Sequence, residues 1–373
     1  MKVSDPRYSE LDWLRVFLIL AVFVHHVFLP FHGHRWHVMN SESSRLLDDT
    51  MIYFEQIRLH TLFFISGAGT AILLSKVNAK EFLFSKFHRL FVPFVIAVVI
   101  VVPPQVYYEN INNYESLISA YQSEVFSFNL YHLWFVEFLF VFMLLAVPLN
   151  GFLNTSFGNS VIFRLEKLTQ HKHGLLSLVL VIALFRLGLK AVMPSQSLRV
   201  ENLSVSMFYL LFFIAGMCVM KTPKLWRAIA ASRKTSLKWL IASTILFYFC
   251  YLKCDVGQYS PSAVRQQLWW LVCTLVSWSG VLTLVGYASA VCVKSPKWLV
   301  ATNEMIYPFY IVHQTVIVAI GFYIVQWNAG MVVKSFSLLV IALISCVAIC
   351  YFLIRPFNIM RYIFGLKVNL LAR

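Results

Sequence analysis

Residues 11–32 read LDWLRVFLILAVFVHHVFLPFH, and this stretch decides the fold class. A helix needs about 20 mostly apolar residues to cross the hydrocarbon core of a bilayer. The stretch is too long for the apolar region of a signal peptide, it contains His25 and His26, and it lacks a small-x-small cleavage site. We therefore expect it to remain in the protein as a transmembrane anchor.

Apolar stretches of similar length follow along the whole chain. Apolar residues make up 60% of the sequence and charged residues 13%, and the mean hydropathy is +0.73. A soluble domain would carry about twice that charged fraction. The sequence therefore predicts an all-α, polytopic membrane protein, with residues 1–373 forming a single integral-membrane domain. We place ten spans at roughly 11–32, 55–74, 90–108, 131–150, 174–193, 204–220, 236–252, 266–293, 304–327 and 333–354.

Positive charge is distributed unequally between the loops. With the N-terminus inside, the inner segments hold 21 Lys and Arg and the outer loops hold 6. This bias predicts that both termini lie in the cytoplasm and that the protein is a multi-pass protein of the inner membrane. The net charge of +15 follows from the same loops, so we expect lipid and not nucleic acid as the surrounding partner.

The seven cysteines lie almost entirely in apolar spans. They show no zinc-type spacing, so we expect them to pack as small apolar residues. Cys250 and Cys254 are four residues apart near a helix end, and a role for that pair stays open.

Ionisable groups inside a span are costly, so each is a candidate functional residue. Arg15 and His26 are eleven residues apart, so they share one helical face about 16 Å apart along the axis. Asp12 can pair with Arg15, and His25 is turned about 100° away. A cation and an imidazole at two depths suit a long anionic donor that enters from inside. The alternative for Arg15 is a helix-end cation whose side chain extends to the membrane surface. The alternative for His26 is a buried histidine with a purely structural role.

Three other charges are expected in the outer half of the membrane. Glu137 and Arg186 would lie roughly 10 Å below the outer surface, near the depth of His26. A structural ion pair between them is slightly favoured over a catalytic role. Arg58 lies in the outer half of its own span.

The first outer loop reads PFHGHRWHVMNSESS at 30–44. Trp36 and His37 offer aromatic and hydrogen-bonding groups that suit a sugar, although Trp also anchors helices at membrane interfaces. A metal site formed by His32, His34 and His37 has no carboxylate at ligand spacing to support it, so no metal is expected.

The stretch LDWLRVFLILAVFVHH at 11–26 resembles the acyltransferase-3 superfamily of membrane O-acyltransferases, whose hallmark is Arg, ten residues and His. Three further stretches resemble it in the same order: IRLHTLFFISGAG at 57–69, HRLFVPF at 88–94 and YPFYIVHQTVIV at 307–318. The resemblance therefore covers most of the chain.

Within that superfamily the sequence is most similar to the periplasmic-glucan succinyltransferases. These also carry a His-x-Trp-His stretch, here His34, Trp36 and His37, and an Arg before the FFISG run, here Arg58. The resemblance implies acyl-CoA as a cytoplasmic donor, a glycan acceptor outside and no permanently bound cofactor. It does not fix the acyl group.

The resemblance also implies roles for individual side chains. His26 would take the proton of a sugar hydroxyl as it attacks the thioester. Arg15, with Asp12, would hold a phosphate of the donor in a charge-assisted pair. Ser66 has either a chemical role or a packing role between helices. The residues expected at the acceptor or in supporting contacts are Arg58, Trp36, His37, Glu137 and His313.

Two functions from other classes stay open. A transporter or flippase for a sugar or lipid-linked substrate would line its path with buried charges, and a non-catalytic assembly partner would neither bind nor hydrolyse acyl-CoA. The prolines inside the spans fall at no corresponding positions in the two halves of the chain, which disfavours a transporter.

Overall fold

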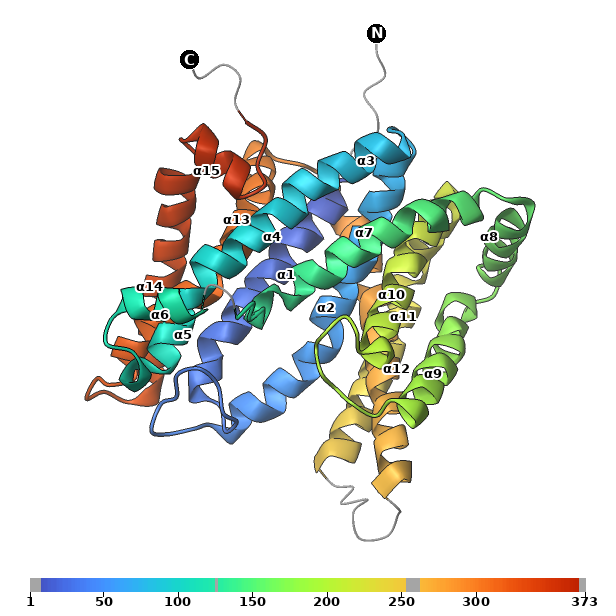
Figure 1. Ribbon diagram of the computed structural model, residues 1–373. Helices are drawn as coiled ribbons and strands as arrows, with labels where there is room; N and C mark the ends of the chain where they lie inside the picture. The colour runs from blue at the N-terminus through green and yellow to red at the C-terminus, as the bar shows by residue number, and fades with distance from the viewer. Residues whose placement is uncertain (1–7, 125–126, 253–261, 369–373) are drawn as a thin grey trace. The chain divides into compact units, whose positions relative to one another are not determined.

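The computed structural model describes residues 8–124, 127–252 and 262–368 (Figure 1). The chain is 81% helical, and the described residues contain no strand, which confirms the all-α prediction. Cys254 lies outside the described residues. The Lys and Arg residues that also lie outside them are Lys2, Arg7, Lys253 and Arg373.

Nine helical segments of the described chain are long and apolar enough to cross a membrane. The remaining predicted span, at 204–220, forms α10 (Leu203–Val219), which is shorter at 17 residues. The multi-pass architecture is thus confirmed, while the N-in, C-in orientation stays a prediction. The nine segments are Ser9–Phe31, Arg45–Leu74, Ala79–Glu109, Tyr131–Leu153, Gly174–Val192, Pro223–Leu252, Ser262–Val291, Lys297–Ile324 and Met331–Ile354.

Among the helices that extend beyond the spans expected from hydropathy, two continue through basic segments. The segment predicted at 90–108 belongs to a helical stretch that begins at Ala79, and the one predicted at 236–252 begins at Pro223. Lys and Arg are good helix formers, so a helix can continue through a basic segment after its apolar part ends. Hydropathy identifies only the membrane-embedded part of such a helix.

The chain folds into two compact units that alternate along the sequence. The first contains Met1–Leu18, Tyr53–Phe82 and Val141–Pro296, and the second contains Ile19–Ile52, Leu83–Phe140 and Lys297–Arg373. Each of four helices has one end in each unit: α1 (Ser9–Phe28), α2 (Arg45–Leu74), α3 (Ala79–Lys86) and α7 (Trp134–Leu153).

In the first unit, helices pack closely where small residues meet. A Cβ atom on Gly67 of α2 would lie 1.9 Å from the carbonyl oxygen of Phe213 in α10, and one on Gly216 would lie 1.9 Å from that of Phe64. Both positions therefore require glycine, as in other close helix contacts within membranes. The remaining helices of this unit are α8 (Ser156–Leu168), α9 (Gly174–Val192), α11 (Pro223–Leu252) and α12 (Ser262–Val291).

Helix α9 is long and apolar enough to cross a membrane although it carries two cations. Arg186 donates from Nη1 to the carbonyl of Trp270 at 3.2 Å and to Oγ1 of Thr274 at 3.1 Å, both on α12. Lys190 is 4% exposed and donates to the carbonyl of Ser195. Because buried charges need polar partners, these contacts explain how an apolar helix tolerates both residues.

The second unit contains the site described below. Its long helix α13 packs against α14 and against α5, and α5 packs against α6 (Figure 1). The helices that lie within this unit are α4 (Val92–Ile96), α5 (Val102–Glu109), α6 (Leu117–Glu124), α13 (Lys297–Ile324), α14 (Met331–Ala348) and α15 (Asn358–Ile363).

Prolines make the helix that leads into α5 irregular. Pro93 and Pro103 follow the π-helical segments Phe87–Phe91 and Ala97–Val101. Proline lacks an N–H and clashes with the carbonyl four residues earlier, and in both cases that carbonyl lies in the π-helical segment. Pro104 acts similarly on the carbonyl of Ile100, which accepts a hydrogen bond from the Tyr121 hydroxyl at 2.6 Å. This contact ties α6 to the base of α5.

Candidate functional site

Polar side chains from three segments of the second unit gather around His26. His26 lies in the last turn of α1, which continues into a 3-10 turn, Leu29–Phe31, and the first loop. That loop supplies Trp36 and His37, and the middle of α13 supplies His313. The structure therefore brings together four of the residues predicted from the sequence.

His26 is linked to a carbonyl through a second histidine. Nδ1 of His313 lies 2.5 Å from the carbonyl oxygen of Tyr310, and Nε2 of His313 lies 3.0 Å from Nδ1 of His26. His313 is 1% exposed, so charging its ring would be costly. These two distances determine which nitrogen of each ring carries hydrogen.

A carbonyl oxygen only accepts hydrogen bonds, so Nδ1 of His313 must donate to Tyr310. Nε2 of a neutral His313 then carries a lone pair and accepts from Nδ1–H of His26. A neutral His26 consequently keeps its own lone pair on Nε2. An imidazole fixed in this tautomer can accept a proton from a substrate hydroxyl.

Aromatic and imidazole rings hold this pair in place. The indole of Trp36 stacks on His26, with ring centroids 6.4 Å apart and planes 24° apart. The His132 ring meets His313 edge-on at 5.1 Å, and its Nε2 donates to the carbonyl of Ile311 at 3.0 Å. The Tyr310 hydroxyl donates to the carbonyl of His132, which joins the start of α7 to α13.

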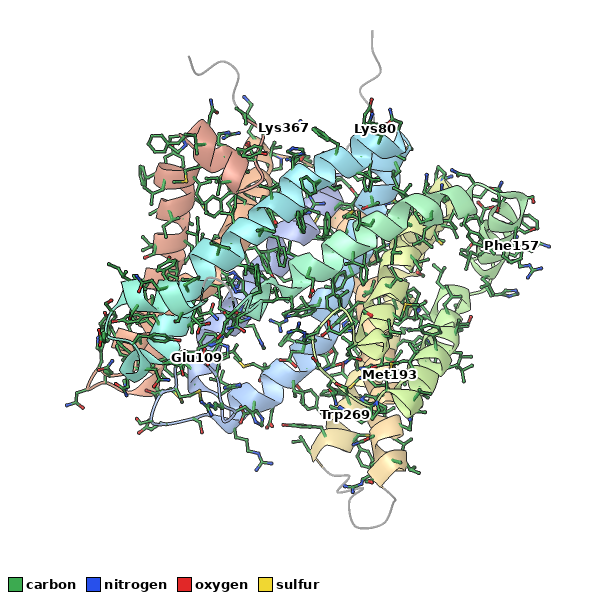
Figure 2. All side chains as sticks on the ribbon, viewed as in Figure 1. Lys80, Glu109, Phe157, Met193, Trp269 and Lys367 are labelled. Atoms are coloured by element: carbon green, nitrogen blue, oxygen red, sulfur yellow. The ribbon has the colours of Figure 1, made fainter. Side chains whose placement is uncertain are left out.

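A second histidine site lies beside the first. Nδ1 of His37 lies 2.8 Å from the carboxylate of Glu109, the last residue of α5, which is labelled in Figure 2. Because a carboxylate accepts, Nδ1 donates to it. Nε2 of His37 lies 3.0 Å from the amide nitrogens of both Gln105 and Gln314. The ring is thus held from α5 on one side and from α13 on the other.

The two histidine sites are connected through neighbours in the sequence. Trp36 contacts His26 while the adjacent His37 contacts Glu109, and His313 contacts His26 while the adjacent Gln314 contacts His37. The sequence prediction missed part of this cluster. It considered charged residues in spans, and so passed over the uncharged side chains of Gln105, Tyr310 and Gln314, and over Glu109 at the end of a span. Gln314, which follows His313 directly in the YPFYIVHQ stretch, was the one available signal.

The predicted donor residues lie in the first unit. Nη1 of Arg15 is 3.6 Å from the Asp12 carboxylate, one turn earlier on α1. A Cβ on Gly69 of α2 would lie 3.8 Å from Nη2 of Arg15, so the guanidinium rests over the end of the FFISGAG stretch. Helix α1 runs without interruption from Ser9 to Phe28 and carries both Arg15 and His26.

The other predicted residues are distributed between the units. Arg58 is 6% exposed and lies on the part of α2 that belongs to the first unit. Arg186 is in the same unit, where its guanidinium carbon lies 4.1 Å from the Phe208 ring centroid in addition to its contacts with α12. Glu137 is in the second unit, in the first turn of α7, where a helix dipole favours an acid.

The first loop does not assemble a metal site. His32 and His34 lie edge-to-face at 5.6 Å, while His37 is directed to Glu109. Burial lowers the pKa of His32, which favours its neutral form. Within the part of the chain that the structure describes, no group of three or more His, Cys, Asp or Glu could hold a metal ion.

Comparisons with known proteins identify a family that matches most of the chain. The family model described as an acyltransferase domain matches residues 8–355. The chain is 25% identical over 240 residues to glucans biosynthesis protein C of Escherichia coli strain K12, with the same identity to that of strain O1:K1 / APEC. The match covers 60% of this chain and 60% of each relative. No solved structure matches the chain.

Proposed function

Because the chain belongs to this acyltransferase family over residues 8–355, we propose that it moves an acyl group from cytoplasmic acyl-CoA to a hydroxyl of a glycan outside the inner membrane. The relatives are named for glucan biosynthesis, which supports a glucan or another envelope glycan as the acceptor. The resemblance to glucan succinyltransferases makes succinyl the first acyl group to test.

The hydrogen-bond chain from the Tyr310 carbonyl through His313 to His26 is the observation that carries this proposal. A hydroxyl is a weak nucleophile near neutral pH, and acyl-transfer enzymes activate it with an adjacent base that a third group orients. His26 is the base in this arrangement and His313 is the group that orients it.

The reaction balances with His26 as the proton carrier. Nε2 of His26 takes the hydroxyl proton while the sugar oxygen attacks the carbonyl carbon of the thioester. A C–O bond forms, the C–S bond breaks, and the CoA sulfur takes the proton from His26. The imidazolium formed on the way keeps its Nδ1–H bond to His313, so its charge is partly satisfied.

Arg15 is proposed to bind the phosphates of the donor, with Asp12 fixing its guanidinium. A guanidinium can bind phosphate oxygens in a two-point contact, which Lys cannot reproduce. Arg15 and His26 lie on one helix, about 16 Å apart by the helical rise. A donor with a long flexible arm between phosphate and thioester suits that separation.

Purified protein in liposomes tests the proposed reaction. Succinyl-CoA or acetyl-CoA is supplied together with a neutral glucose oligosaccharide, and thiol release is measured alongside the mass of the glycan. We expect one acyl group on the glycan for each thiol released. Movement of unmodified glycan across the liposome membrane would identify a transporter. A protein that neither binds nor cleaves acyl-CoA would be an assembly partner. Either result would contradict the proposal.

The sidedness of the proposal rests on the charge bias of the loops. A cytoplasmic reporter fused after residue 228 and a periplasmic reporter fused after residue 113 should both be active. A periplasmic signal at residue 228 would reverse the orientation and place the His26 cluster on the donor side.

A further inference from the structure

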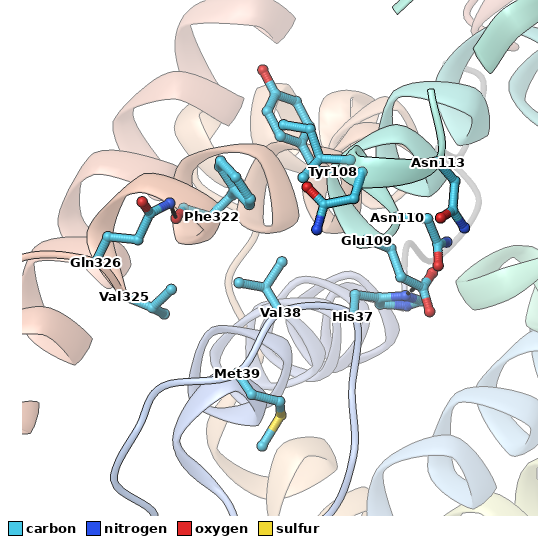
Figure 3. Close-up of a pocket in the computed structure, with 12 residues that line it drawn as sticks. His37, Val38, Met39, Tyr108, Glu109, Asn110, Asn113, Phe322, Val325 and Gln326 are labelled. Carbon is cyan, nitrogen blue, oxygen red and sulfur yellow. Dashed lines mark hydrogen bonds and ion pairs between the residues drawn. The ribbon is translucent and has the colours of Figure 1, made fainter. Parts of the chain in front are cut away.

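A cavity of about 570 Å³ lies beside His37 in the second unit (Figure 3). Its walls come from residues 37–39 of the first loop, residues 108–113 at the end of α5, and residues 322–326 at the end of α13. The volume falls within the range of roughly 300–1,000 Å³ that is typical of small-ligand sites. It is therefore large enough for a short stretch of a polymer.

Amide side chains provide much of the polar lining. Asn110, Asn112 and Asn113 lie in or next to the 3-10 turn Ile111–Asn113 that follows α5. Gln326 lies just after the end of α13, across the cavity from Asn110 and Asn113 (Figure 3). Each amide offers both donors and an acceptor, as does each hydroxyl of a sugar. The rings of Tyr108 and Phe322, 5.5 Å apart, add an aromatic surface at the same cavity.

The charge of the lining selects against anions. Among the described residues that form the walls there is no Lys or Arg, and Glu109 contributes a carboxylate. Lys334 is 6% exposed behind the wall, where its Nζ donates to Asn40 and to the carbonyl of Val325. An anionic ligand would therefore meet like charge and find no cation in the lining.

Resting on the transfer reaction proposed above, we infer that this cavity binds one or two uncharged sugar units of the acceptor, next to the unit that is acylated. The amides bind the hydroxyls, and Glu109 disfavours sugar acids and phosphorylated sugars. His37 belongs both to the cavity and to the cluster around His26, through Trp36. Sugar in the cavity would thus place the next unit of the same glycan near His26.

Two amide variants test the assignment with a neutral glucose oligosaccharide as the probe. Asn113→Ala and Gln326→Ala should each raise the KM for the oligosaccharide by about 2- to 10-fold, because each removes a hydrogen-bonding group. The KM for acyl-CoA should not change. Gln170→Ala, at an exposed amide in the first unit, is the matched control and should leave both KM values unchanged.

Charge selectivity gives a second readout of the same site. The wild-type protein should use the neutral oligosaccharide better than the same molecule oxidised to a carboxylate at one end. Glu109→Gln removes the negative charge from the cavity, so it should reduce the preference for the neutral oligosaccharide over the oxidised one. Equal use of both probes by the wild type overturns the proposal.

The outcomes separate this inference from the proposed reaction. If glycan is acylated with an unchanged KM in both amide variants, the cavity is not the acceptor site, although the reaction stands. If no glycan is acylated, calorimetry with the neutral oligosaccharide decides: binding that Asn113→Ala weakens supports the cavity, and absence of binding to the wild type overturns it.

Discussion

Arg186 in the first unit and His26 in the second are both polar groups within helical spans, but the protein treats them differently. A carbonyl, a hydroxyl and an aromatic ring of neighbouring helices surround the guanidinium of Arg186. His26 instead receives an orienting contact from His313 that fixes its tautomer and keeps a lone pair on Nε2. The hydrogen bonds that Arg186 donates to α12 stabilise the fold, whereas the tautomer of His26 leaves a basic ring nitrogen that can take a proton from a substrate.

The depth of a charge in the membrane does not distinguish these two cases. The sequence predicts nearly the same depth for both groups, and depth alone makes both of them candidate functional residues. The contacts of each side chain distinguish the two cases. This distinction can be tested by measuring the activity and stability of variants.

The largest effect should come from His26→Ala. Loss of a general base should lower kcat by about 100- to 10,000-fold while acyl-CoA still binds. His25→Ala is the control, because that ring lies about 100° around α1 and should keep most of the activity. Turnover and calorimetric binding on the same purified variants decide this point. An active His26→Ala beside an inactive His25→Ala would refute the helical-face assignment.

His313→Ala should cause the next largest loss, through the orientation of His26. We expect kcat to fall by up to about 100-fold, with little change in either KM. His313→Gln should recover part of it, because an amide can donate to the Tyr310 carbonyl and accept from His26. A purely structural role predicts equal loss in both variants, together with a lower denaturation temperature.

Arg15→Ala should weaken the donor step. Loss of a charge-assisted hydrogen bond costs about 1.5–3 kcal/mol, or roughly 10- to 100-fold in the KM for acyl-CoA. Arg15→Lys should restore little of the affinity for acyl-CoA if the guanidinium forms two hydrogen bonds with the phosphate. A normal KM for acyl-CoA with reduced kcat would remove Arg15 from the donor site.

Arg186→Ala should have the smallest effect on activity. The variant should lose about 1.5–3 kcal/mol of stability, because its charged hydrogen bonds to α12 are removed. Turnover per folded molecule should stay within about twofold, since no step of the proposed chemistry uses this residue. Denaturation midpoints and turnover are measured on the same samples. If the Arg186→Ala variant is folded but turns over as slowly as His26→Ala, the purely structural role of Arg186 is refuted.

The helical spans were predictable because the bilayer imposes a minimum length and an apolar composition on each crossing. The shared helix of Arg15 and His26 was predictable because helical spacing is local. The partners of those residues were not. His26 and His313 are 287 residues apart in sequence, and no periodicity encodes a contact between them.

The environment of Lys334 was also not predictable from the sequence. The sequence predicts it to be one of the six Lys and Arg residues of the outer loops, but it lies in the first turn of α14 and is buried. Its ammonium group binds Asn40 and the carbonyl of Val325. Hydropathy places a lysine near a helix end without showing whether it faces water or a protein oxygen.

The tautomer of His26 decides whether this ring can act as the general base. Nitrogen-15 NMR of histidine-labelled protein reports which ring nitrogens carry hydrogen, and the signals of His26 and His313 are assigned by their loss in His26→Gln and His313→Gln. We expect neutral His26 to carry its hydrogen on Nδ1 and none on Nε2, and we expect the Nδ1 signal to shift in His313→Gln. A neutral His26 with its hydrogen on Nε2 would refute its role as the general base.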